Sequence, residues 1–241
     1  MARLVTFDVV DTIIKVRHSA SQQYVTAAAK FGLVVTKKAI KSVYRETWHQ
    51  HKLQHPLYGV HQGLTNDQFW RSFIHKVFRK LGFENEHTSV DKTADLLIDN
   101  FKNDPLMYEQ LPGALEMLKE LQKRNYRLGV ISNFDDTLKH ALVKQKLSHY
   151  FAFIVTCKDA MAEKPDGRIF RHALNLAAVD PSEAVHVGDD IERDYYASRR
   201  VGMRALLLRT PAANRKALSE IPPEFVVNCL SDVPNALNQF S

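Results

Sequence analysis

Short apolar runs and helically spaced apolar residues alternate along this chain in a way that predicts a parallel sheet. The run at residues 4–7 ends on a carboxylate, Asp8, and is typical of a buried strand. From residue 112 onwards, helical patterns alternate with short apolar runs. Strands are predicted at residues 127–131, 151–155, 184–187, 204–208 and 225–227. Such alternation indicates βαβ units and an α/β fold.

The stretch between these two regions carries only helical patterns. Apolar residues recur at helical spacing over residues 21–31, 36–53, 65–81 and 89–101. Thr65 and Gln68 have the spacing of a capping box. The strand at residues 4–7 has no partner strand until after this block. We therefore predict a four-helix unit at residues 17–107, inserted into a discontinuous sheet domain made of residues 1–16 and 108–241.

Composition narrows the class of protein. With 241 residues, 45% of them hydrophobic, the chain can bury a substantial core. Cys157 and Cys229 are too few for a secreted disulfide scaffold, so we expect an intracellular setting, cytoplasmic or nuclear. No stretch has the pattern of a signal peptide or a spanning helix, which predicts no membrane partner. The formal charge is +6, but basic residues are scattered among acids, and this pattern disfavours nucleic-acid binding.

Polar side chains follow the predicted strands at the edge where open α/β sheets bind ligands. Asp8 follows the first strand. Ser132 and Asn133 follow the strand at residues 127–131 and offer a hydroxyl and an amide that suit a phosphoryl oxygen. Lys164 precedes Pro165 at the start of a helix, where its ammonium could neutralise a carboxylate and a phosphate. These groups predict chemistry on a phosphorylated molecule.

A third set of polar residues predicts a metal site. Gly188, Asp189 and Asp190 follow the strand at residues 184–187, and Asp194 comes four residues later. Hard carboxylate oxygens of this kind suit Mg²⁺, which binds through one or two carboxylates and keeps several waters.

Taken together and in this order, these residues resemble the four motifs of the haloacid dehalogenase superfamily. The motif residues are Asp8 with Thr12, Ser132-Asn133, Lys164-Pro165, and Gly188-Asp189 with Asp194. The resemblance implies a doubly wound, Rossmann-like parallel sheet, with the helical insertion as a cap that covers the site. It also implies a small phosphorylated substrate.

The resemblance implies a role for each motif residue. Asp8 would be the nucleophile that forms an aspartyl-phosphate. Mg²⁺ would be held by Asp8, Asp189 and the backbone carbonyl of Val10. Thr12, Ser132, Asn133 and Lys164 would hold the phosphoryl group, and Lys164 would also neutralise its charge. Asp190 and Asp194 would order the surroundings of the metal and its waters.

The chain departs from the family pattern at Val10. Phosphatases of this superfamily carry a second Asp there as general acid and base, a function typically worth about 10² to 10⁴ in rate. Asp11 is adjacent, but in a strand its side chain would point away from the face of Asp8. Only an irregular turn could redirect it. The other interpretation is that Asp11 satisfies amides of the turn.

Two classes of function therefore remain open. One is a Mg²⁺-dependent phosphatase-type hydrolase that is slow or acts on good leaving groups such as acyl or aryl phosphates. The alternative is a catalytically impaired protein of this fold that binds a phosphorylated ligand or a protein partner. Retention of Gly188-Asp189 disfavours a metal-free dehalogenase, and a phosphonatase would need a cap lysine such as Lys76.

Two histidines of the predicted cap suggest a different metal site. His51 and His55 are four residues apart, so they could share a helical face as in zinc sites. One helix supplies too few ligands, however, and this remains the weaker interpretation.

Overall fold

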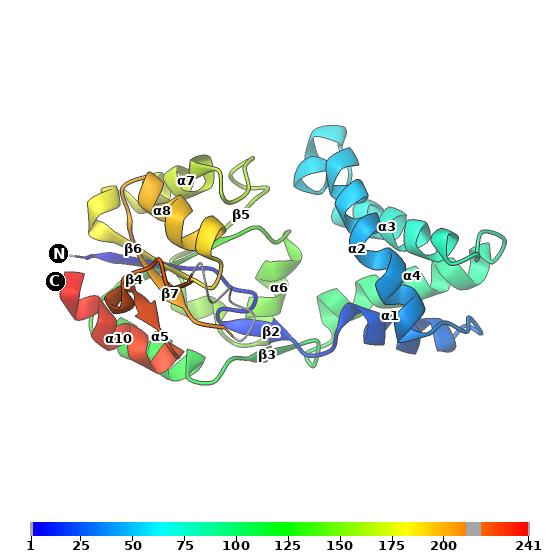
Figure 1. Cartoon of the computed structure of the whole chain (residues 1–241), viewed down its shortest axis with the longest axis horizontal. Coiled ribbons are helices and arrows are strands. Elements are labelled where there is room, and N and C mark those ends of the chain that lie inside the picture. Colours follow the sequence, from blue (N-terminus) through cyan, green and yellow to red (C-terminus); the bar gives the residue numbers. More distant parts are fainter. Residues whose placement is uncertain (1, 211–217, 241) are drawn as a thin grey trace. The chain divides into compact units, whose positions relative to one another are not determined.

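The computed structural model describes residues 2–210 and 218–240, and the chain divides into two compact units (Figure 1). The sheet unit spans Met1–Lys15, Tyr108–Phe134 and Leu142–Ser241. The helical unit spans Val16–Met107 and also includes Asp135–Ala141. Each unit is described by itself below.

Six parallel strands form the sheet unit, in the order β5-β4-β1-β6-β7-β8. Their bounds are β1 (Leu4–Phe7), β4 (Arg127–Ser132), β5 (Phe153–Thr156), β6 (Ala184–Gly188), β7 (Arg204–Leu208) and β8 (Val226–Val227). The first strand is central, and all four of its residues are buried because both faces of the sheet are covered. The predicted parallel α/β sheet is confirmed.

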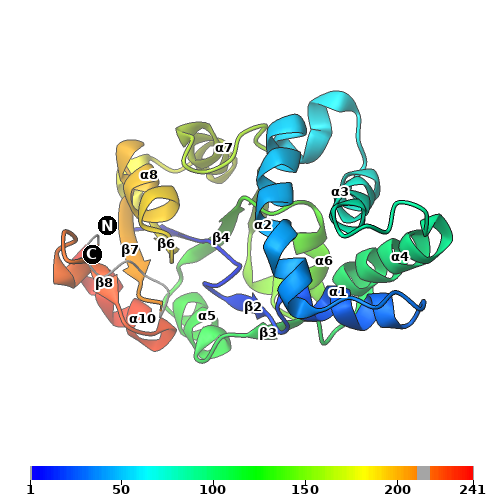
Figure 2. The same cartoon turned by 45° about the vertical axis from the view of Figure 1, so that its right-hand side comes forward.

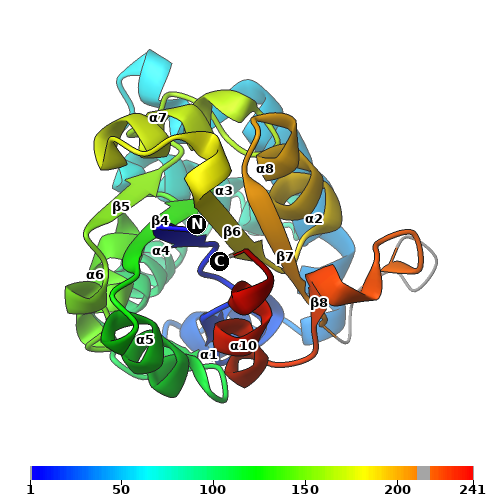
Figure 3. The same cartoon turned by 90° about the vertical axis from the view of Figure 1, so that its left-hand side faces the viewer.

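Helices cover both faces of this sheet. They are α5 (Ala114–Lys123), α7 (Gly167–Ala177), α8 (Ala197–Arg200) and α10 (Val233–Ala236). One further helix, α6 (Thr137–Lys144), is divided between the two units. Figure 3 shows α5 and α10 on one face and α7 and α8 on the other. This doubly wound arrangement brings the carboxyl ends of β1, β4 and β6 to one edge, because Phe7 pairs with both Val130 and Val187.

A two-stranded sheet was not predicted. It pairs β2 (Ile14–Val16) with β3 (Tyr108–Gln110), where the chain leaves the sheet unit and returns to it. Lys15 and Glu109 form an ion pair of 3.0 Å across the two strands. The pattern after Ile14 favours helix, but three-residue strands are too short to give a period-two signal. Their pairing depends on residues far apart in the sequence.

The helical unit contains the four predicted helices. They are α1 (Ala20–Ala29), α2 (Lys37–Gln54), α3 (Asn66–Lys80) and α4 (His87–Asn103). Both α1 and α3 pack against α2 and α4 (Figure 2). Phe73 and Phe78 are fully buried at the centre of this unit. The predicted capping box is present, because Thr65 accepts from the Gln68 amide and Gln68 accepts from the Thr65 amide.

The segment Asp135–Ala141 groups with these helices and includes the start of α6. Asp135 is fully buried; one carboxylate oxygen accepts from the Thr137 amide and hydroxyl, and the other accepts from Nε1 of Trp70 at 2.6 Å. A buried carboxylate needs such donors. The contact therefore fixes the first turn of α6 to α3.

His51 of α2 and His55, the residue after this helix, do not form a metal site. Nε2 of buried His51 bonds the Phe69 carbonyl at 3.1 Å, and Nδ1 lies 2.9 Å from the Lys76 ammonium. Burial lowers the pKa of His51 to about 4, so the neutral ring accepts from Lys76. Both ring nitrogens are thus engaged by the protein. Within residues 2–210 and 218–240, the one cluster with metal-ligand geometry is elsewhere.

None of the helices in the described part of the chain is both long and apolar enough to cross a membrane.

Candidate active site

Asp8 follows β1 at the edge of the sheet, and the chain then turns sharply. The Val9 carbonyl accepts hydrogen bonds from the amides of Thr12, Ile13 and Ile14, at 3.3, 2.8 and 3.0 Å. Asp11 has a φ of 64°, in the left-handed region. The strand therefore ends before these residues, and the expectation that strand alternation orients Asp11 is wrong. The irregular turn that the sequence left open is present.

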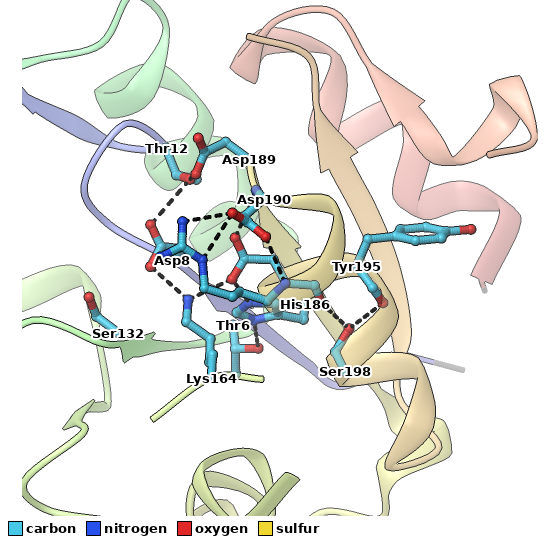
Figure 4. Close-up of polar contacts among 12 residues, drawn as sticks. Thr6, Asp8, Thr12, Ser132, Lys164, His186, Asp189, Asp190, Tyr195 and Ser198 are labelled. Carbon is cyan, nitrogen blue, oxygen red and sulfur yellow. Dashed lines mark hydrogen bonds and ion pairs between the residues drawn. The ribbon is translucent and has the colours of Figure 1, made fainter. Parts of the chain in front are cut away.

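Asp8 forms a buried ion pair with Lys164, which also binds Asp194. Nζ of Lys164 donates to Oδ1 of Asp8 at 2.7 Å and to Oδ1 of Asp194 at 2.6 Å. The exposed fractions of Asp8, Lys164 and Asp194 are 9, 4 and 2%. Figure 4 shows Asp8 and Lys164 facing one another, although 156 residues separate them. The two carboxylates thus share one ammonium.

Burial and charge push the pKa values of these groups apart. Burial raises the pKa of Asp8 to about 7 despite the opposing charge of Lys164, and the Asp194 and Asp189 carboxylates add to the rise. Burial opposes ionisation of Asp194 as well, but Lys164 and His186 outweigh it and hold the pKa of Asp194 well below its usual range. Burial lowers the pKa of Lys164, yet Asp194 and Asp8 reverse this and raise it. Asp194 is therefore the permanent anion of the site.

Asp189 follows β6 and approaches Asp8 through Thr12. The buried Thr12 hydroxyl lies 3.4 Å from Oδ2 of Asp8 and 3.3 Å from Oδ1 of Asp189. Burial raises the pKa of Asp189 to about 6, and the charges of Asp194 and Asp11 add to the rise. The Thr12 hydroxyl therefore separates two carboxylates. Its contact with a phosphoryl group stays a prediction.

Carboxylate oxygens from Asp8, Asp189 and Asp194 lie within 4.8 Å of one another, which suits a single cation. Burial raises the pKa values of Asp8 and Asp189, and a cation among these oxygens would favour their ionised forms. The Val10 carbonyl accepts no hydrogen bond from the described residues, so its oxygen is available as a ligand. The donor set fits Mg²⁺.

Asp190 has a different place from the other acids. Its side chain accepts the amides of Glu192 and Arg193 and caps the π-helical turn Ile191–Tyr196. The Arg193 guanidinium also donates to Asp190, at 2.7 and 2.9 Å. The carboxylate of Asp190 therefore orders the turn that carries Asp194, and its influence on a metal stays a prediction.

The residues after β4 support the site in two ways. Ser132 is 2% exposed, and its Oγ accepts the Phe134 amide at 3.3 Å. Oδ1 of Asn133 accepts the Lys164 amide at 2.6 Å, and Nδ2 donates to the Lys164 carbonyl at 2.8 Å. Asn133 therefore holds the backbone of Lys164 in place. A direct contact of either side chain with phosphate stays a prediction.

Sequence reasoning missed Thr6 and His186, two fully buried polar residues. The imidazole bonds Thr6 through Nδ1 at 2.9 Å and Asp194 through Nε2 at 3.2 Å (Figure 4). The sequence did contain a signal for both residues. Each residue stands two positions before a motif residue, Asp8 or Gly188, and each is the polar exception in an apolar strand.

A cavity of about 580 Å³ lies beside Asp189 in the sheet unit. Asp11 and Arg209 supply charged groups to its wall, and Leu208 and Leu230 supply apolar surface. Its volume is in the range of small-molecule sites, roughly 300–1,000 Å³. The left-handed turn thus places Asp11 on this cavity, next to Asp189.

The chain is similar in sequence to known proteins. A family profile described as haloacid dehalogenase-like hydrolase matches residues 33–208. The chain is 39% identical to haloacid dehalogenase-like hydrolase domain-containing protein 3 of Xenopus laevis, over 93% of this chain and 91% of that protein.

Solved structures share the fold. The structure of 2-haloacid dehalogenase from Pseudomonas syringae pv. Tomato DC3000 has a TM-score of 0.69 at 25% identity and covers 100% of both chains. The magnesium-bound putative HAD-hydrolase YfnB from Bacillus subtilis also has a TM-score of 0.69, at 16% identity, over 98% of this chain and 99% of that one. The predicted family and fold class are confirmed: the chain belongs to the haloacid dehalogenase-like hydrolases.

Proposed function

We propose that this protein is a Mg²⁺-dependent phosphatase-type hydrolase that uses Asp8 as its nucleophile. The observation that carries the proposal is the sharing of the Lys164 ammonium by Asp8 and Asp194 at 2.7 and 2.6 Å, next to Asp189. A metal-free dehalogenase has no need of a three-carboxylate cluster. A small phosphorylated molecule is the proposed substrate.

In the first step, a carboxylate oxygen of Asp8 bonds to phosphorus while the bond from phosphorus to the leaving oxygen breaks. Lys164 holds Oδ1 of Asp8 and offsets the negative charge of the entering phosphoryl group. Water then cleaves the aspartyl-phosphate and returns the free carboxylate. Asp8 and Asp189, with the carbonyl of Val10, would hold Mg²⁺, which when bound supplies positive charge to phosphoryl oxygens.

Val10 decides which substrates the proposed enzyme can use. Its isopropyl group cannot protonate a leaving oxygen, so that oxygen departs as an anion and its own pKa enters the barrier. Acyl and aryl phosphates leave as weak bases and need no acid. Alkyl phosphates leave as strong bases, and their hydrolysis should be slow by about 10² to 10⁴.

The proposal is tested by measuring hydrolysis of a substituted aryl phosphate series and of an alkyl phosphate, with Mg²⁺ and with a chelator. Rates should require Mg²⁺ and should fall steeply as the pKa of the phenol rises. Asp8→Asn is the matched control, because it keeps the shape and removes the nucleophile. A flat series with chemistry rate-limiting would mean that another residue supplies the proton.

The second candidate is a protein of this fold that binds a phosphorylated ligand or a protein partner without turnover, and Val10 is the observation that favours it. Calorimetry with Mg²⁺ and inorganic phosphate separates the two. Binding that is lost in Asp189→Ala, together with no hydrolysis of any aryl phosphate, would favour this second candidate.

A further inference from the structure

His186 is the residue that links the acid cluster to the interior of the sheet. It lies on β6, fully buried, opposite Thr6 of β1 in the strand register. Phe170 of α7 packs against the imidazole at 5.1 Å between ring centroids, with its plane at 87°. The ring is therefore enclosed by β1, α7 and the turn that carries Asp194, and its two nitrogens bond only protein groups.

The hydrogen bonds define which nitrogen of His186 carries the proton. The Asp194 carboxylate can only accept, so Nε2 donates to its Oδ1 at 3.2 Å. Nδ1 lies 2.9 Å from the Thr6 hydroxyl, a shorter contact than the 3.4 Å from that hydroxyl to the Val185 carbonyl. These distances assign the Thr6 proton to Nδ1, which leaves the ring neutral, and burial of the ring favours the same form.

The same oxygen of Asp194 receives His186 and Lys164. Oδ1 takes Nζ of Lys164 at 2.6 Å and Nε2 of His186 at 3.2 Å, while Oδ2 takes the Asp190 amide at 3.0 Å. Lys164 in turn donates to Asp8 at 2.7 Å. A continuous chain of buried hydrogen bonds thus runs from Thr6 through His186, Asp194 and Lys164 to Asp8.

We propose that His186 is a positioning residue, in its neutral Nε2–H form, that holds the Asp194 carboxylate against Lys164 and so orients the ammonium toward Asp8. Thr6 sets the tautomer by donating to Nδ1. The effect on catalysis rests on the proposed function. The effect on the Lys164 ammonium does not rest on the proposed function, because it concerns the protein without substrate. Networks of this kind fix rotamers that a single contact leaves free.

The test follows the Lys164 ammonium and the His186 ring by nitrogen NMR in isotope-labelled protein. His186→Leu removes the donor to Asp194, and exchange of the Lys164 ammonium protons should accelerate by on the order of tenfold. His186→Gln restores an N–H donor and should restore slow exchange. Wild type should show the neutral Nε2–H tautomer, and Thr6→Val should populate the other tautomer.

Val130→Ala is the control for lost stability alone. Val130 is fully buried on β4, where it pairs with Phe7, and its side chain forms no hydrogen bond, so Val130→Ala opens a cavity without removing a donor. Proton exchange of the Lys164 ammonium in Val130→Ala should match that of wild type when each protein is measured at the same interval below its own melting temperature. Exchange in His186→Leu that equals wild type, or equal acceleration in Val130→Ala, would overturn the proposal.

Turnover of an aryl phosphate supplies the second readout. His186→Leu should lower kcat by on the order of tenfold with a smaller change in KM, and His186→Gln should recover most of kcat. Unchanged kcat in His186→Leu, when wild type is active, would also overturn the proposal. A wild type without turnover would remove the proposed function, and the exchange of Lys164 would still decide the role of His186.

Discussion

Gly188 and Asp194 are packed so closely that a Cβ at position 188 would lie 2.3 Å from Cγ of the Asp194 carboxylate. Real Cβ atoms do not approach so near. The absence of a side chain at the end of β6 is therefore what lets Asp194 reach Lys164 and His186 across the sheet edge. The missing side chain of Gly188 leaves room for Asp194, and the backbone conformation of Gly188 plays no part in this.

Gly188→Ala should therefore displace Asp194 and weaken the protein. Overpacking of this kind costs about 1–3 kcal/mol, and the displaced carboxylate should also lower Mg²⁺ affinity. Thermal unfolding and Mg²⁺ calorimetry measure the two effects. Gly202→Ala, where the nearest atom would be Cβ of Pro181 at 3.3 Å, is a comparison far from the acids. Equal Mg²⁺ affinity in Gly188→Ala and wild type would contradict the prediction.

The metal-free protein should lose stability as pH rises from about 4 to about 7. Asp8 and Asp189 have ordinary pKa values of 3.8, raised in the folded chain to about 7 and about 6. The folded state therefore holds more protons than the unfolded state in this window, and ionisation on raising the pH costs folding free energy. Urea unfolding with chelator present at several pH values measures the slope.

Asp8→Asn isolates the contribution of Asp8, the proposed nucleophile, to that slope. The variant should be more stable than wild type above pH 7 without metal, by about 1–3 kcal/mol, because it removes a carboxylate that is costly to ionise. Saturating Mg²⁺ should reduce or reverse the difference, since a cation favours the ionised Asp8. Lower stability of Asp8→Asn at every pH would show that its ion pair with Lys164 outweighs burial.

Val10→Asp should raise hydrolysis of alkyl phosphates. The new carboxylate stands where phosphatases of this superfamily carry the acid, and general acid–base help is worth about 10² to 10⁴ in rate. The gain should be smaller with aryl phosphates that need no proton. The ratio of kcat/KM for alkyl and aryl substrates is the measurement, and an unchanged ratio would count against a missing acid as the cause of slow turnover.

Asp11→Asn should change turnover little, within about threefold, because no hydrogen bond or ion pair joins Asp11 to Asp8 or Lys164 in the described part of the chain. It should lower the pKa of Asp189 by removing a neighbouring charge. Asn tolerates the left-handed φ of 64° that this position requires, so the turn is kept. Turnover and the pH dependence of Mg²⁺ binding check both statements. If Asp11→Asn abolishes activity while Val10→Asp has no effect, Asp11 is the displaced acid.

The sequence by itself determined the layered fold and most of the polar groups that meet at one edge of the sheet. Strand and helix periods are local, so the strand at residues 4–7 and the four helices of the inserted unit could be predicted from spacing alone. Asp8, Ser132 and Asp189 could be brought together without coordinates, because parallel strands end at one edge of a sheet. Lys164 stands before a helix, and the family resemblance placed it with them. The capping box of Thr65 and Gln68 is local in the same way.

Only the tertiary structure decided what each polar group bonds. Asn133 turned out to hold the Lys164 backbone, and Thr12 lies between Asp8 and Asp189. Asn133 and Lys164 are 31 positions apart, and Thr12 and Asp189 are 177 apart. No local period encodes contacts over such separations. The left-handed turn at Asp11 likewise depends on amides gathered at the Val9 carbonyl.

His186 shows most clearly the difference between what the sequence reveals and what only the folded chain decides. In sequence it is one histidine in an apolar strand, which is more often a packed core residue than part of a site. Its partners, Thr6 and Asp194, come from a neighbouring strand and a following turn. Register across the sheet and the space left by Gly188 bring them together, and both are properties of the folded chain.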